Sequence, residues 1–266
     1  IGDCVAKAGP RLDAEVLRQL INRQVPEDPA AHAAFATSML MLSEVVRKRA
    51  RPRSRACELA YQLLLEASRV IGGEAVNAIL IALASAQLAR PSTDRAGDAE
   101  RAATLLAPLV DGSPGCEAQR RVWLLTAEAS LRMRGDRAAL VESCLALCDR
   151  ALQQLGPDAR GIEWATAQML RGDALRERAR GKRGDNLEEA IAAYREALAR
   201  VRKDEHVDTW AQCKLGVGLA YALRQTGEPK DNQLRAIENL TEAVSHLDET
   251  ARLELALGRL HLARLL

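Results

Sequence analysis

Residues 186–198 read NLEEAIAAYREAL, and residues 232–244, 46 positions later, read NQLRAIENLTEAV. In the first segment a small, a large and a small side chain stand at Ala190, Tyr194 and Ala197. Residues at i, i+4 and i+7 lie on one face only when the chain is an α-helix. The second segment has the same pattern in the same three places. Both segments are therefore predicted to be helices that use one face for close packing.

The same small–large–small pattern recurs further back in the chain. Its first member stands at positions 60, 102, 144, 190 and 236, which gives steps of 42, 42, 46 and 46 residues. A pattern that returns at a nearly fixed period is the signature of a repeat protein, in which each unit buries its apolar face against its neighbours. The sequence therefore predicts an array of helical repeats.

The composition agrees with closely packed helices. The chain of 266 residues holds one Phe, three Trp and three Tyr, and its formal net charge is +2. Few aromatic residues argue against a β-sandwich, and so small a net charge does not by itself indicate nucleic-acid binding. No run of 18 apolar residues predicts a membrane span. The six cysteines show no paired framework, so free thiols in a reducing cytoplasm are expected.

Proline and glycine residues divide the chain into pairs of helices, which we call A and B in chain order. Residues 1–29 are expected to hold one helix, over 11–24, and a linker. Residues 250–266 are expected to form a last helix, as half a repeat or a cap. Because that helix is still apolar where the sequence ends, the natural protein is expected to continue beyond Leu266. Between the N-terminal segment and this last helix, five pairs are predicted, over about residues 30–73, 74–115, 116–157, 158–204 and 205–249.

Pairs four and five match each other most closely, and their pattern resembles the tetratricopeptide repeat family. Trp164 and Gly172 return 46 residues later as Trp210 and Gly218. The helix–turn–helix unit of that family carries small residues where helices touch, but its usual period is about 34 residues. The matching positions of pair five are Leu215, Gly216, Leu219 and Tyr221 on helix A and Ala236, Leu240 and Ala243 on helix B.

This resemblance implies an all-α fold, a right-handed α-solenoid whose A helices line a concave surface. The form WAxxxLGxGxAY, residues 210–221, followed by NxxxAIxxxxxAV is also similar to bacterial arrays that precede caspase-like CHAT peptidase domains. The repeat here is longer than the standard unit, and the surplus lies between Gly216 and Ala236. Helix A or the A–B loop is therefore expected to be longer than in the family.

The resemblance also implies which side chains meet a partner. Some family members hold a partner's C-terminal carboxylate with Lys and Asn on the A helices. Those positions here read Ala167, Cys213 and Val217, which argues against that mode of binding. Trp164 and Trp210 open the A helices and either face the groove or pack beneath it. The residues that the resemblance places along the groove are Gln168, Arg171, Lys214, Val217 and Tyr221.

No catalytic pattern stands out. The sequence has no glycine-rich phosphate loop, no HExxH, no GxSxG and none of the His and Cys motifs of CHAT peptidases. Cys144 and Cys148 lie one helical turn apart, but no further ligands are near them in the sequence, so we interpret them as core residues. We therefore expect no enzyme activity, no metal and no cofactor within these residues.

Basic residues crowd two predicted A–B junctions. Residues 47–55 and 176–183 hold eleven Lys and Arg residues against one acid, Glu177. The helix dipole attracts cations to the ends of helices, and this effect accounts for part of the pattern. The remaining charge predicts a recognition edge for an acidic protein partner. The basic residues expected to contact that partner are Arg176, Arg178, Arg180 and Arg183.

These features predict a non-catalytic scaffold or adaptor that binds a protein or peptide through the concave face, the basic edge or both. The alternative is the recognition or regulatory arm of a larger effector, such as a CHAT-type peptidase, with catalysis outside this chain. Nucleic-acid binding is less favoured, because aromatic residues are not interleaved with the arginines. We also expect the C-terminal helix to permit self-association.

Overall fold

The structure is a computed structural model of the chain. It describes residues 75–89, 92–112, 117–157, 159, 161–247 and 251–265, together with positions 31, 34–35, 37–41, 43, 61 and 64–65. Every regular element within these ranges is a helix, so the all-α prediction is confirmed. The helix expected over 11–24, most of the first pair and the basic cluster at 47–55 lie outside the described residues.

The chain divides into two compact units, residues 1–112 and 113–266. The boundary falls close to the predicted border between the second and third pairs, at residues 115 and 116. Among the described residues of the first unit, two helices pack on each other and a short 3-10 helix follows. These are α5 (Ala75–Ala89), α6 (Arg95–Leu106) and η3 (Ala107–Leu109). The division into five pairs itself stays a prediction.

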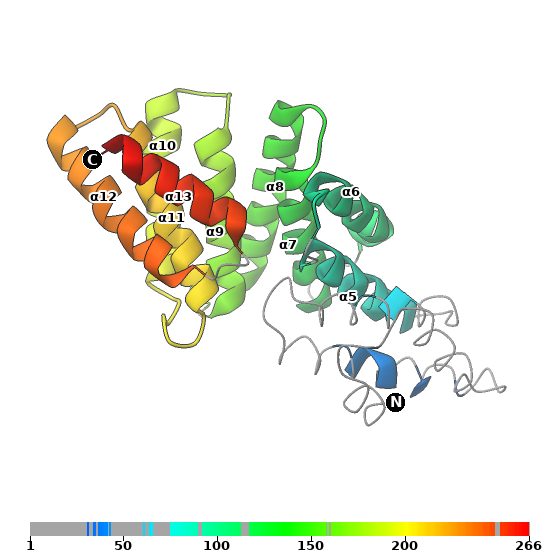
Figure 1. Ribbon diagram of the computed structural model, residues 1–266. Helices are drawn as coiled ribbons and strands as arrows, with labels where there is room; N and C mark the ends of the chain where they lie inside the picture. The colour runs from blue at the N-terminus through cyan, green and yellow to red at the C-terminus, as the bar shows by residue number, and fades with distance from the viewer. Residues whose placement is uncertain are drawn as a thin grey trace. The chain divides into compact units, whose positions relative to one another are not determined.

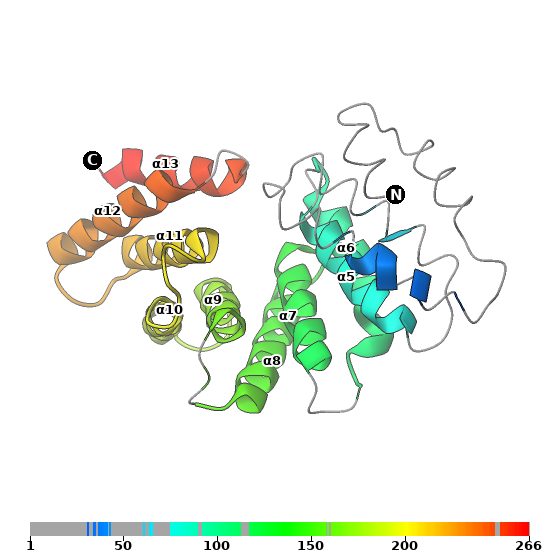
Figure 2. The same cartoon turned by 90° about the horizontal axis from the view of Figure 1, so that it is seen from below.

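Seven helices of the second unit are described, and each packs against the next along the chain. The odd-numbered helices also contact one another in sequence, α7 with α9, α9 with α11, and α11 with α13. Figure 1 shows α12 and α13 beside α11, and Figure 2 gives the view from below. The helices are α7 (Glu117–Arg132), α8 (Arg137–Leu155), α9 (Ile162–Glu177), α10 (Arg183–Leu198), α11 (Val207–Leu223), α12 (Pro229–His246) and α13 (Arg252–Leu265). The A helices of the predicted pairs are thus α7, α9 and α11, and the B helices are α8, α10 and α12.

Local sequence explains where the helices begin and end. Asp136 accepts hydrogen bonds from the backbone N–H groups of Ala138 and Ala139 at 3.0 and 3.2 Å, which caps the start of α8. Gly156 ends that helix with φ +79°, a conformation that costs glycine little. Pro229 stands in the first turn of α12, where its missing N–H has no helical partner to lose.

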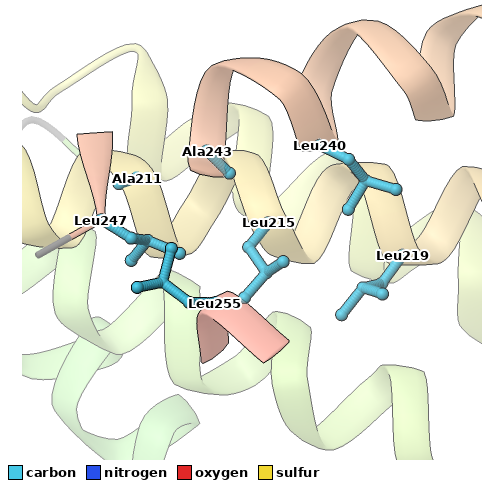
Figure 3. Close-up of a cluster of buried hydrophobic side chains, with 7 residues drawn as sticks. All are labelled: Ala211, Leu215, Leu219, Leu240, Ala243, Leu247 and Leu255. Atoms are coloured by element: carbon cyan, nitrogen blue, oxygen red, sulfur yellow. The ribbon is translucent and has the colours of Figure 1, made fainter. Parts of the chain in front are cut away.

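The predicted small positions lie in the core of the second unit. Ala190 and Ala236 are fully buried. Leu215 of α11, Leu240 of α12 and Leu255 of α13 belong to one buried cluster, drawn in Figure 3. Three helices therefore share a core, which also contains Ala211 of α11 and Ala243 of α12. None of the described helices has both the length and the apolar character needed to cross a bilayer.

Candidate partner-binding surface

Two ion pairs join consecutive helical pairs in the same way. Arg178, just after α9, donates to both carboxylate oxygens of Glu142 on α8 at 2.8 and 2.9 Å. Arg224, 46 residues later, donates to both oxygens of Glu188 on α10 at 2.6 and 3.1 Å. Each guanidinium lowers the pKa of its glutamate. A repeated bidentate contact thus fixes α9 to α8 and α11 to α10.

Two buried asparagines, also 46 residues apart, fix the A–B loops. Asn186 Nδ2 donates to the backbone oxygen of Arg180 at 2.7 Å, and Asn232 Nδ2 donates to that of Thr226 at 2.8 Å. Both asparagines lie in the first turn of a B helix and are about 95% buried, with exposed fractions of 4% and 5%. Because each asparagine is part of a B helix, its hydrogen bond fixes the path of the A–B loop before that helix. The side chains that the loop carries therefore have defined positions.

Tyr194 of α10 fills the space that two glycines leave. A Cβ atom at Gly172 of α9 would lie 2.7 Å from the tyrosine ring, and one at Gly216 of α11 would lie 2.8 Å from Tyr194 Oη. The hydroxyl donates to Asp173 Oδ1 at 2.7 Å. Burial raises the pKa of both Asp173 and Tyr194. This tyrosine therefore joins α9, α10 and α11 by close packing and one polar contact.

Cations cover the tryptophans near the start of the A helices. The guanidinium carbon of Arg150 lies 4.5 Å from the ring centroid of Trp123, and that of Arg200 lies 4.2 Å from that of Trp164. Two lysines approach the ring of Trp210 in the same manner. Trp164 is 9% exposed, so it packs beneath the surface instead of lining an open groove. Cation–π contact of this kind stabilises the array.

Two of the side chains expected to line the groove turn toward B helices. Arg171 of α9 contacts Asp149 of α8 at 3.2 Å and Glu189 of α10 at 3.6 Å. Lys214 of α11 contacts Glu242 of α12 at 2.6 Å. Both side chains therefore lie where an A helix meets the B helices that flank it. That they also line a partner-binding groove stays a prediction.

The rest of the expected groove set is largely covered. Val217 and Tyr221 are only 3% and 4% exposed, and Gln168 is half-buried. Leu215 and Leu219 occupy the side of α11 that packs with α12 and α13. At 100° per residue, Val217 and Tyr221 therefore lie on the side of α11 opposite to Leu215 and Leu219. That any of these residues contacts a partner stays a prediction.

Three of the four predicted contact arginines make contacts within the protein. Arg178 is held by its glutamate, as described above. Arg176 is half-buried, with Nη2 3.7 Å from Asp173 Oδ1. Arg183 Nη1 donates to the backbone oxygen of Arg176, while Arg180 is exposed. Part of the charge counted over residues 176–183 is therefore used within the protein, and the partner contact stays a prediction.

A second basic cluster surrounds Tyr221, and we call it the Tyr221 cluster. Arg195 Nη2 of α10 donates to Tyr221 Oη at 2.6 Å, and Arg235 Nη1 of α12 donates to the same oxygen at 3.3 Å. Arg224 is the third member, and its guanidinium carbon lies 5.6 Å from the ring centroid. The side chains of Arg195 and Arg235 are exposed around the buried hydroxyl. The cluster therefore gathers three guanidinium groups from two B helices and the end of an A helix.

The Tyr221 cluster carries an excess of positive charge. Glu188 neutralises Arg224, and its pKa is lowered further by the more distant charge of Arg195. No carboxylate in the described part of the chain lies within ion-pair distance of Arg195 or Arg235. Three arginines against one glutamate leave two positive charges at the surface.

A pocket of about 380 Å³ adjoins the cluster between the C-terminal end of α11, the first turns of α12 and the end of α13. The amide of Gln233 donates to the backbone oxygen of Leu265 at 2.5 Å on its border. Tyr221 and Arg224 belong to both the cluster and the pocket. The polar part of the lining consists of Arg224, Gln225, Asn232 and Gln233.

Sequence reasoning found Tyr221 but missed the arginines around it. Arg224 carried a signal, because Arg178 stands 46 residues before it in the same contact. Arg195 directly follows the repeat position Tyr194 on α10, and Arg235 directly precedes the repeat position Ala236 on α12. No fixed spacing along the chain links them, so only the packing of α10 and α12 on α11 brings them together.

Comparison of the chain with models of known protein families, with curated proteins and with solved structures gives no match.

Proposed function

We propose that the chain is a right-handed solenoid similar to the tetratricopeptide repeat family and that it binds a protein partner without catalysis. The observation that carries the proposal is the return of the same interhelical contacts after 46 residues. Glu142 and Arg178 meet as Glu188 and Arg224 do, each pair joining one A helix to the preceding B helix. Repetition of one interface along the chain is how a solenoid is built.

The chemistry of the surface favours a protein partner over a small molecule. Leu234 of α12 is 57% exposed and adjoins the exposed Arg235 in the sequence. Leu253 and Leu260, on α13, are 62% and 49% exposed. Arginine beside exposed apolar side chains is typical of the surfaces that proteins use to bind one another. The excess positive charge of the Tyr221 cluster favours an acidic segment of the partner.

The test is to present the full chain to an array of acidic, neutral and basic peptides and to duplex DNA, each at low and high salt. We expect acidic peptides to bind and their affinity to fall severalfold as salt rises. Replacing the exposed Arg180 by Ser should weaken this binding if the predicted edge takes part, whereas Arg202→Ser, between α10 and α11, is the matched control. Binding to DNA with no peptide bound would contradict the proposal.

A further inference from the structure

The Tyr221 cluster is incomplete as a set of hydrogen bonds. Tyr221 Oη accepts from Arg195 and from Arg235, which leaves its own proton available to donate. Among the described residues no acceptor for that proton is recorded. The hydroxyl is buried, yet both arginines remain exposed. A group that accepts hydrogen bonds would complete the set from the solvent side.

The electrostatics of the cluster point to an anion. Arg195 and Arg235 carry like charges and converge on one neutral oxygen, which is unfavourable without a negative charge between them. Glu188 is already bound by Arg224 and by Thr226, whose hydroxyl donates to it at 2.6 Å. Two positive charges thus remain, which a dianion would neutralise.

The number of donors favours a tetrahedral anion. Arg195, Tyr221 and Arg235 each supply donors, and they belong to three different helices. A planar carboxylate presents two oxygens, whereas a phosphate monoester presents three acceptor oxygens and about two negative charges near neutral pH. We propose that the Tyr221 cluster binds a phosphate monoester, carried by a phosphorylated serine or threonine of the protein partner.

The adjoining pocket favours a phosphate attached to a peptide. Its volume of about 380 Å³ leaves room beside the cluster for residues that flank the phosphorylated one. Gln225 and Gln233 line it with amide groups, which can donate to and accept from a peptide backbone. Leu265 adds an apolar wall. The assignment of the phosphate to a peptide rests on the proposed protein-binding function, whereas the binding of phosphate by the Tyr221 cluster does not.

The experiment measures fluorescence anisotropy of labelled peptides with the full chain. One probe is a degenerate peptide pool with a single fixed phosphoserine, and the second is the same pool with serine. We expect the phosphorylated pool to bind roughly tenfold tighter or more, because charge-assisted hydrogen bonds to arginine are strong. Arg235→Gln should remove most of this difference, Tyr221→Phe should reduce it, and Arg259→Gln should leave it unchanged. Inorganic phosphate should displace the phosphorylated pool from the wild-type chain.

The outcomes separate this inference from the proposed function. A preference that survives Arg235→Gln overturns the phosphate site, and so does equal affinity for both pools when inorganic phosphate does not raise the melting temperature, even if acidic peptides still bind elsewhere. Equal affinity for both pools overturns only the peptide source if inorganic phosphate raises the melting temperature of the wild-type chain and Arg235→Gln abolishes this rise. Arg235 is exposed, so its variant should fold, and circular dichroism checks this. Arg195→Gln should act in the same way as Arg235→Gln. If Arg195→Gln unfolds, Arg235→Gln still decides the result.

Discussion

An alanine at position 216 should destabilise the second unit even though alanine favours helices. Replacing glycine within a helix normally gains about 1 kcal/mol. Here the new Cβ would lie 2.8 Å from Tyr194 Oη and still closer to two ring carbons, whereas ordinary contact begins at 3.4 Å. Tyr194 has little room to yield, because it is fully buried, packs on Gly172 and is bonded to Asp173. Overpacking costs about 1–3 kcal/mol, so after the helix-propensity gain we expect a net loss of up to about 2 kcal/mol.

Urea unfolding followed by circular dichroism measures the effect. Gly184→Ala is the matched control, since a Cβ there would meet only Thr226 Cγ2, at 3.9 Å, and should leave stability equal or slightly higher. In a Tyr194→Leu background, which copies Leu240 of the next pair, the penalty of Gly216→Ala should shrink. A Gly216→Ala protein as stable as the Gly184→Ala protein would refute the close contact of α10 and α11 on which this reasoning depends.

Three further changes test the electrostatics and the core. Burial raises the pKa of Asp173, so the folded state loses stability as pH rises through that pKa. Asp173→Asn should therefore be at least as stable as wild type at neutral pH, with the difference vanishing in acid, and a less stable variant at pH 7 would show that the carboxylate is needed. Glu188 has a lowered pKa beside Arg224, so its contribution, about 1 kcal/mol or less for a partly exposed pair, is present near neutral pH and lost as pH falls through that pKa. In urea titrations across pH, Glu188→Gln should be less stable than wild type near neutral pH and equally stable in acid. Glu238→Gln should not show this difference. Ala236→Leu should cost about 1–3 kcal/mol by overpacking, and an unchanged melting temperature would mean that position 236 is not a close helix contact.

Sequence alone was enough to predict the helices and their packing faces. The spacing of Ala190, Tyr194 and Ala197 is meaningful only on a helix, and all three are buried. Asp136 and Gly156 likewise mark the ends of α8, which lies within the predicted pair over residues 116–157. These features depend on residues within one or two turns of each other, so the chain's local chemistry determines them.

The tertiary structure decided which side chains meet across helices. Arg195 and Arg235 reach Tyr221 because α10 and α12 both pack on α11, and no spacing along the chain encodes that meeting. Arg171 and Lys214 contact carboxylates of B helices for the same reason. Arg171 has carboxylates on both flanking helices, and these were as far as 22 residues away along the chain. The rotation of each helix about its axis is set by how neighbouring side chains interlock. A period of 46 residues along the sequence does not determine that rotation, so it is known only from the packed helices.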